Sequence, residues 1–151
     1  MGTLNLRPSE QAAVVGNIDP DVYTAATYLT AYVPAKNFNQ FLAIIQAGTL
    51  GASATLDAKI VQATDASGTG SKDVTGLAIT QLTQAGTDSD NQALINVRAD
   101  DLDIANSFTH LAISMTVGTA TSDAGAVLLG FGPRYGPASD NDASTVDEIV
   151  G

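Results

Sequence analysis

Residues 48–76, GTLGASATLDAKIVQATDASGTGSKDVTG, contain a strand pattern followed by a turn. Within 54–60, small or aliphatic residues alternate with polar ones, and this period of two is typical of a strand with one buried face. Residues 65–71 then combine two glycines with short polar side chains, a composition that favours chain reversal. We therefore predict that a second strand, over about 72–82, returns antiparallel to the first.

Further strands are indicated on both sides of this hairpin. Short apolar or alternating runs, rich in Val, Ile, Thr and aromatic residues, are separated by Gly, Pro, Asn and Asp. The predicted strands lie at 12–15, 22–33, 38–47, 93–97, 108–117 and 126–131. Turn signals at Gly16-Asn17 and Asp19-Pro20 are expected to end the first strand, and Pro34 is expected to end the second.

The run 38–47, FNQFLAIIQA, has features of both a helix and a strand. The helical spacing is matched by Phe38, Phe41, Leu42 and Ile45. The paired isoleucines and the glycine that follows suit a buried strand, which we favour. The chain then has about eight strands and no helix long enough for a βαβ crossover. This pattern predicts an all-β fold, an antiparallel β-sandwich that is jelly-roll-like.

The chain of 151 residues fits a single β-sandwich domain. We place an extended N-terminal arm at residues 1–11, the sandwich at 12–132 and an acidic C-terminal tail at 133–151. Neither end has enough apolar residues to offset the backbone ordering cost of about 1–2 kcal/mol per residue. Both are therefore predicted to be mobile in isolated subunits and to become ordered against a partner.

Composition limits the classes of partner. Six basic residues against sixteen acidic ones give a net charge of −10. This charge would repel phosphate groups, so we predict no nucleic-acid partner and no membrane partner. The chain has no cysteine and no apolar run of signal-peptide or membrane-spanning length, so we expect a soluble protein that is made in the cytoplasm.

No catalytic constellation is predicted. His110 is the only histidine, and a Ser-His-Asp arrangement would have to include it. It lies within an alternating run, on the face with Phe108 and Ala112, and we interpret it as an ordinary strand histidine. Sixteen acidic residues could supply a carboxylate pair by chance, so their presence does not indicate glycoside cleavage. We predict that the protein is not an enzyme.

Three aspartate-rich loops resemble cation sites in part. Residues 65–70, DASGTG, repeat the oxygen spacing that begins a calcium loop, but its twelfth position is Gly76 instead of a bidentate glutamate. Residues 88–91 and 100–103 are also acidic, yet turns favour Asp for its backbone hydrogen bonds alone. We predict no metal ligand and no cofactor.

Arg134 and Tyr135 are the candidate interface residues. They follow the last predicted strand between Gly132-Pro133 and Gly136, a context that favours a tight exit from the strand. Arg and Tyr anchor protein interfaces more often than most residues do, so we expect this pair to hold the tail in a groove of a neighbouring subunit.

Most of the chain resembles small virion proteins that are encoded among the head genes of tailed bacteriophages. The resemblance lies in residues 48–103, in FTHLAISMTV at 108–117 and in FGPRYGPASDNDASTVDEIV at 131–150. It implies a head decoration (cement) protein on the outer surface of the virion, made in the host cytoplasm. The implied partners are the major capsid protein and further copies of the chain itself, since such proteins are often trimers. The family has no motif from which a functional residue carries over.

Two alternatives remain open at the level of sequence. A neck, head–tail connector or tail protein built from the same kind of sandwich would have a similar composition. Its copy number would separate it from a decoration protein, because a virion holds hundreds of decoration proteins and far fewer connectors. A calcium- or glycan-binding adhesion module rests only on the aspartate loops.

Overall fold

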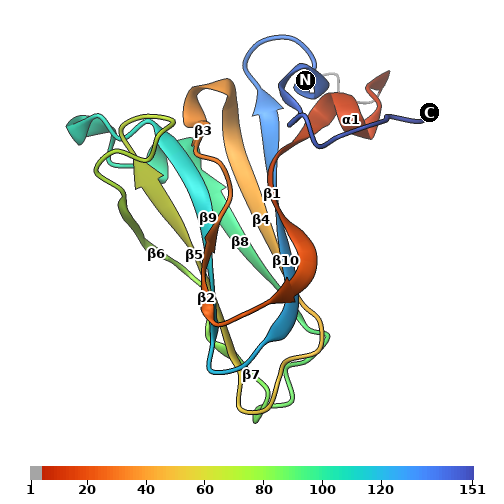
Figure 1. The fold of residues 1–151 in the computed structure, drawn as a ribbon. Helices are drawn as coiled ribbons and strands as arrows, with labels where there is room; N and C mark the ends of the chain where they lie inside the picture. Colours follow the sequence, from red (N-terminus) through yellow and green to blue (C-terminus); the bar gives the residue numbers. More distant parts are fainter. Residues whose placement is uncertain (1–4) are drawn as a thin grey trace.

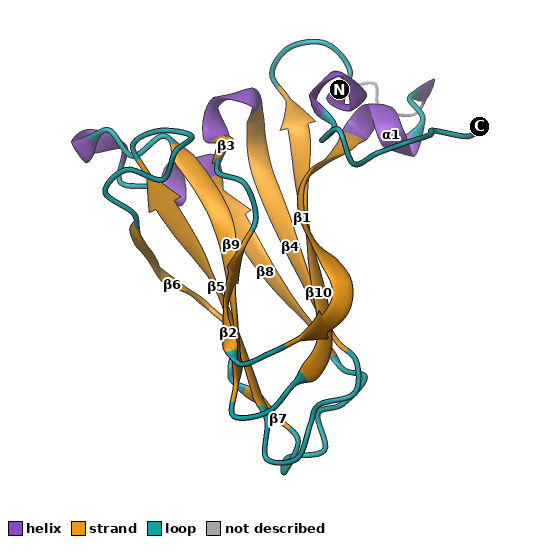
Figure 2. Cartoon of the chain, viewed as in Figure 1, coloured by secondary structure: helices purple, strands orange, loops and turns teal. Residues whose placement is uncertain are grey.

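The computed structural model describes residues 5–151, which form a sandwich of two β-sheets with short helical turns near its ends (Figures 1 and 2). The strands are β1 (Ala12–Tyr23), β2 (Ala26–Leu29), β3 (Val33–Pro34), β4 (Phe38–Ala47), β5 (Thr55–Ala63), β6 (Lys72–Ala78), β7 (Leu82–Thr83), β8 (Gln92–Arg98), β9 (His110–Gly118) and β10 (Ser122–Pro133). The helical turns are α1 (Pro8–Gln11), η2 (Ala35–Asn37), η3 (Ala99–Asp101), η4 (Ile104–Asn106) and η5 (Ala138–Asn141).

The strands pair in a nested order. The first pairs with the last, β1 with β10; moving inward, β2 and β3 pair with β9, β4 with β8, and β5 with β6 and β7. Two cross-pairings, β10 with β4 and β5 with β9, complete the sheets β1-β10-β4-β8 and β2-β9-β5-β6. Every pairing is antiparallel.

A long hairpin rolled up in this manner is a jelly roll. Ten segments fill eight strand positions, because β2 and β3 share the edge of β9, and β6 and β7 share the edge of β5. The predicted all-β antiparallel sandwich of about eight strands is therefore confirmed. The ambiguous run 38–47 is a strand, β4, in the middle of its sheet.

The core lies between the sheets and is filled by alternate residues of each strand. Leu56, Ala58 and Ile60 of β5 point inward, as the alternation in 54–60 predicts, and lie beside the inward residues of β9. The largest fully buried hydrophobic side chains are Phe38, Ile45, Leu56, Ile60, Leu111, Ile113, Met115, Leu128, Val97 and Val117. Burying each such aliphatic or aromatic side chain contributes about 1.5–3 kcal/mol.

The first predicted strand is too short, because β1 continues through both turn signals to Tyr23. The register against β10 shifts between Val14 and Gly16 and again between Ile18 and Asp21, and such bulges absorb residues that a regular ladder would reject. Pro20 lies inside the second shift, where no ladder hydrogen bond is needed from its nitrogen. The turn-forming residues therefore bend the strand without ending it.

The single strand predicted over 22–33 is wrong. β1 ends at Tyr23, and the chain crosses to the other sheet before β2 begins at Ala26. A second break lies at Thr30, whose buried hydroxyl accepts a hydrogen bond from Ile113 N at 3.0 Å while Thr30 N donates to Ile113 O at 3.1 Å. At this point between β2 and β3, the Thr30 side chain replaces a backbone acceptor in the pairing with β9.

Smaller differences concern the strands β6, β7 and β10. The strand predicted over 72–82 is split into β6 and β7, with a register shift opposite residues 59–61 of β5. β10 begins at Ser122, inside the stretch expected to be a loop. The reversal predicted at 65–71 is present: Thr64 N donates to Thr69 O at 3.0 Å, and Gly68 and Gly70 have φ of +82° and +66°.

The C-terminal end of the chain lies near α1, at one end of the sandwich (Figure 1). Residues 1–4 of the predicted N-terminal arm lie outside the described residues, and the rest of the arm contains the single turn of α1. Part of the tail has its partner in the same chain. Ala138 is fully buried, Val14 N donates to Asp142 Oδ1 at 2.8 Å, and Ala143 N donates to Val14 O at 2.7 Å.

Candidate interaction surfaces

The predicted interface residues Arg134 and Tyr135 follow the end of β10 and are both exposed. Gly132 and Gly136, with φ of +63° each, bend the chain on either side of the pair. Arg134 N donates to Asn37 O at 3.0 Å, which fixes this backbone beside η2. The Tyr135 side chain is 80% exposed, whereas Arg134 contributes to the wall of a pocket.

This pocket, the basic end pocket, lies between β3, η2 and the η3–η4 segment. It has a volume of about 500 Å³, within the range of about 300–1,000 Å³ that is usual for ligand pockets. Its lining is mainly apolar and consists of Pro34, Ala35, Lys36, Ala99, Leu102, Ile104, Phe108, Thr109, His110 and Arg134. A bond from Ala35 N to Thr109 O, 2.9 Å long, ties η2 to the segment before β9 and so shapes the pocket floor.

Cations are scarce in this protein, and their distribution is uneven. Three of the six form ion pairs: Lys59 with Asp73 at 2.8 Å, Lys72 with Asp103 at 2.5 Å and Arg98 with Asp100 at 3.2 Å. A fourth, Arg7, contacts the carbonyl of Gly151. Lys36 and Arg134 have no ion pair within residues 5–151, and both line the basic end pocket.

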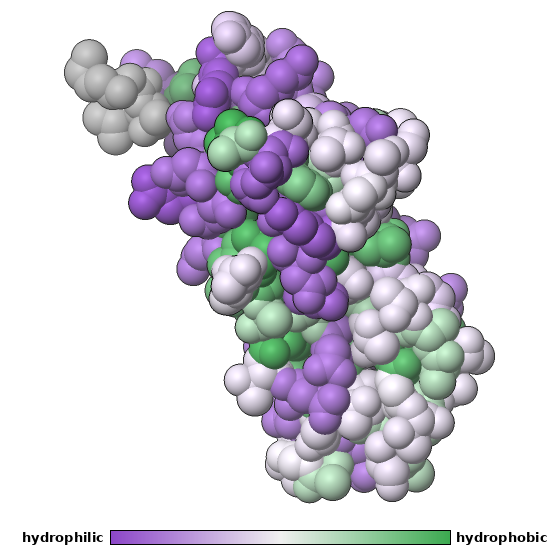
Figure 3. All heavy atoms as spheres, turned by 90° about the vertical axis from the view of Figure 1, so that its left-hand side faces the viewer, coloured by the Kyte–Doolittle hydropathy of each residue, from purple (hydrophilic) through white to green (hydrophobic). Residues whose placement is uncertain are grey.

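A second surface lies on the outside of the β1-β10-β4-β8 sheet. The register places Leu94, Ile44 and Val127 in one row across β8, β4 and β10, and Leu42 beside Leu129 in the next. We call this set, with Phe131, the outer apolar face. Leu94 is 60% exposed and the others are half-buried. Figure 3 shows a different view, the side that is at the left in Figure 1, where the hydrophobic areas are small and lie among hydrophilic and intermediate ones.

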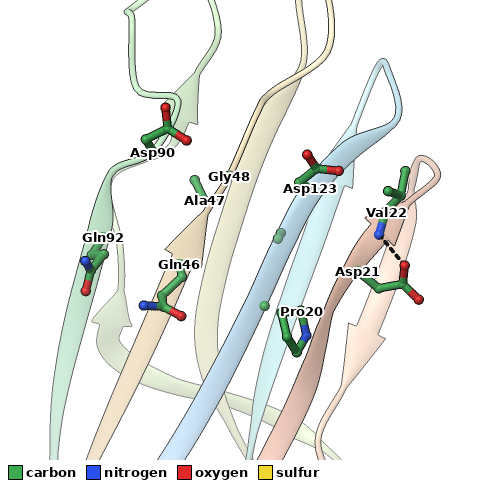
Figure 4. Close-up of a pocket in the computed structure, with 11 residues that line it drawn as sticks. Pro20, Asp21, Val22, Gln46, Ala47, Gly48, Asp90, Gln92 and Asp123 are labelled. Atoms are coloured by element: carbon green, nitrogen blue, oxygen red, sulfur yellow. Dashed lines mark hydrogen bonds between the residues drawn. The ribbon is translucent and has the colours of Figure 1, made fainter.

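The opposite end of the sandwich has an acidic pocket of about 540 Å³ (Figure 4). Asp21, Asp90 and Asp123 line it from separate segments, and Figure 4 shows their side chains spread across the pocket instead of meeting at one point. Asp21 Oδ1 accepts from Val22 N at 2.7 Å. Residues 5–151 contain no group of three or more His, Cys, Asp or Glu that could hold a metal ion.

The aspartates of the three acidic loops serve the turns that contain them. Asp65 Oδ1 accepts from Ser67 N at 2.9 Å and from Thr69 N at 3.1 Å, and hydrogen bonding from the Thr69 side chain and backbone lowers the pKa of Asp65. Asp88 Oδ2 accepts from Thr83 N at 2.9 Å, and Asp101 Oδ2 accepts from Arg98 N at 2.7 Å. These bonds are the backbone interactions for which turns favour Asp.

His110 is the first residue of β9 and not a mid-strand residue, because the strand begins two residues later than the predicted 108. Its Nδ1 lies 2.9 Å from Thr109 Oγ1. Within the part of the chain that the structure describes, this is the hydrogen bond of the imidazole ring, and its partner is a hydroxyl group and not a carboxylate. The histidine lies at the wall of the basic end pocket, which Arg134 also lines.

Sequence reasoning located Arg134 but missed the other side chains that form its surroundings. Lys36, Ile104 and Phe108 come from three segments that the jelly roll brings to one end of the sandwich. A signal for Lys36 was available in the sequence, since it is one of six cations in an acidic chain. No local pattern marks Ile104 or Phe108 as pocket residues, because their proximity depends on strand pairing.

None of the helices in residues 5–151 is both long and apolar enough to cross a membrane. No family model matches the chain, and no curated protein matches it. Two solved structures of infectious bursal disease virus contain similar chains. The Gt strain chain is 13% identical with a TM-score of 0.40, and the Gx strain chain is 14% identical with a TM-score of 0.41. Each alignment covers 92% of this chain and 38% of the viral chain, and at this level of likeness no family is established.

Proposed function

We propose that this chain is a structural protein of a virus particle, specifically a capsid decoration protein of a tailed bacteriophage. The observation that carries the proposal is the outer apolar face, a row of half-buried aliphatic and aromatic side chains with the exposed Leu94, on a four-stranded sheet. Exposed apolar patches of this kind mark protein–protein interaction sites. The resemblance of residues 48–103 to phage head proteins supports the choice of partner, the major capsid protein.

The jelly roll suits this role physically. The strands β4 and β10 are paired on both sides and β8 is paired with β4, so the outer apolar face is held in place before it meets a partner. A stable interface buries about 1,200–2,000 Å² in total, which one sheet face together with neighbouring loops can supply. Each bound copy would stabilise the assembled head by mass action, because it binds only the assembled lattice.

The test is addition of the purified protein to expanded, undecorated heads of the phage whose genome encodes it. We expect a fixed stoichiometry relative to the major capsid protein and a higher resistance of the heads to heat and to low ionic strength. Heads that are equally stable with and without the protein would refute decoration.

Mass spectrometry of whole particles provides an independent measurement. A decoration protein on the head surface is expected in hundreds of copies per particle. A count of tens or fewer would instead assign the chain to the neck or tail. Negative-stain images of particles with a labelled protein would then show its position directly.

A further inference from the structure

The basic end pocket combines an apolar lining with two cations, Lys36 and Arg134, that form no ion pair within residues 5–151. Arg134 N is held by Asn37 O at 3.0 Å, so Arg134 lies next to the turn that carries Lys36. In a chain with a net charge of −10, these two cations place positive charge at one pocket.

The neighbouring carboxylates are already engaged. Asp103 is paired with Lys72, and Asp100 with Arg98. Neither aspartate is therefore the partner of Lys36 or Arg134 in the described structure. The positive region at the pocket is available for an acidic group from outside the subunit.

The apolar part of the pocket has a buried floor and an exposed wall. Leu102 is 5% exposed and lies at the floor, whereas Ile104 in the wall is 59% exposed. The ring of Phe108 is half-buried, with the Lys72 ammonium 4.1 Å from its centroid. The complementary ligand is thus an acidic segment that also carries aliphatic side chains.

The end of this chain has that chemistry. Asp147 and Glu148 form no ion pair within residues 5–151, and Ile149 and Val150 are 51% and 83% exposed. In its own subunit this segment turns toward α1, where Gly151 O contacts Arg7. Figure 1 shows the end marked C on the far side of β1 from β3, away from the basic end pocket.

We infer that the basic end pocket binds residues 147–150 of a second copy of the chain. Lys36 and Arg134 pair with the carboxylates of Asp147 and Glu148, and the aliphatic side chains that follow fill the apolar floor. Arg134 therefore belongs to the receiving surface and not to the inserted segment. The tail is held on its own subunit at Thr145, whose Oγ1 donates to Asn17 Oδ1 at 3.3 Å, and at Gly151, so binding to a second copy replaces the contact between Gly151 and Arg7.

Such a contact joins two different parts of the chain, so copies either exchange tails across a two-fold axis or join heterologously, head to tail. Heterologous contacts close into rings when the rotation between copies permits it. The inference does not depend on capsid binding, since it concerns purified subunits alone. Its failure would leave the decoration proposal untouched.

The experiment measures self-association of the full chain by sedimentation velocity over a range of concentrations. A pocket variant, Lys36→Gln with Arg134→Gln, and a tail variant, Ile149→Ser with Val150→Ser, should each weaken association about tenfold or more. A matched control, Lys59→Gln, removes an ion-paired cation away from the pocket and should leave association unchanged. Mixing the two variants should give a dimer without larger species, because the mixture contains one intact pocket and one intact tail.

A second measurement uses a fluorescently labelled peptide, STVDEIVG, corresponding to residues 144–151. We expect saturable binding to the full chain, weakened by salt and lost in the pocket variant. A charge exchange, Lys36→Glu and Arg134→Glu in the protein against Asp147→Lys and Glu148→Lys in the peptide, should restore it. The inference is overturned if the pocket variant associates and binds peptide like the wild type. It is also overturned if decanoate, a small anionic amphiphile, occupies the pocket while the peptide does not.

Discussion

The Lys72 ammonium lies 2.5 Å from Oδ2 of Asp103 and joins the start of β6 to the loop before β9. The same carboxylate accepts hydrogen bonds from Asn106 Nδ2 at 2.9 Å. Hydrogen bonding from Lys72, followed by that from Asn106, lowers the pKa of Asp103 below the ordinary value of an aspartate. The pairing connects two loops at the end of the sandwich that holds the basic end pocket.

This lowered pKa predicts a loss of stability in acid. The folded state holds the Asp103 proton more weakly than the unfolded chain, so the ion pair stabilises the fold fully above the unfolded pKa of about 3.9. The contribution is lost as the pH falls from there through the folded-state pKa. We expect Asp103→Asn to flatten this part of the profile in urea unfolding at pH 7, 4 and 3. Lys72→Met should have the same effect, and an Asn variant as acid-sensitive as the wild type would contradict the assignment.

The outer apolar face predicts a substitution that separates binding from folding. Leu94→Lys places a charge on a side chain that is 60% exposed, so the melting temperature should change little. Binding to heads should weaken by about 30-fold, the size of a hot-spot loss of about 2 kcal/mol. Leu29→Lys is the matched control, since Leu29 is 51% exposed on the opposite sheet. Equal loss of binding in both variants would point to a general charge effect.

Removing the Thr30 hydroxyl while keeping the side-chain shape should lower the unfolding free energy substantially. Thr30→Val leaves Ile113 N without its acceptor in a site where Thr30 is 4% exposed, which should cost about 1–3 kcal/mol of unfolding free energy. Thr27→Val, at the exposed hydroxyl 2.8 Å from Thr116 Oγ1, should cost less than about 0.5 kcal/mol. Chemical denaturation of both variants checks the difference, and similar costs would argue against the buried acceptor.

Close packing at Gly130 predicts a clash. A Cβ at this position would lie 2.7 Å from Cδ2 of Phe38, whose ring is 1% exposed. Gly130→Ala should therefore destabilise the fold by about 1–3 kcal/mol. Combining it with Phe38→Leu should cost less than the sum of the two single substitutions, because the smaller side chain removes the clash. Additive costs in the double variant would show that the two positions do not interact.

The parts of the fold that sequence predicts well are those in which one face of a strand is buried. Alternation in 54–60 identified β5 and its inward residues, and glycines with positive φ marked the following turn. Prediction failed near Pro20 and Thr30, where tertiary contacts override local preference. A bulge accommodates Pro20 within β1. The buried hydroxyl of Thr30 interrupts the segment that the sequence pattern predicts as one continuous strand.

The candidate sites were less predictable than the fold. Arg134 and Tyr135 were selected by residue type, and no measurement has yet tested either as an interface residue. The pocket around Arg134 forms where η2 and the η3–η4 segment meet. Predicting it would require the pairing between strands that are far apart in the chain. The outer apolar face has the same origin, because Leu94, Ile44 and Val127 become neighbours only through strand register.

The position of β10 between β1 and β4 has a consequence for synthesis on the ribosome. β1 emerges first, yet its only neighbour within the sheet is the last strand to be made. The hairpin of β5 and β6 can close early, because few residues separate its strands, whereas the outermost pair must close a loop of nearly the whole chain. We expect a ribosome-bound chain that ends before Ser122 to remain sensitive to protease at β1. Protection should appear only after the final strand has left the exit tunnel.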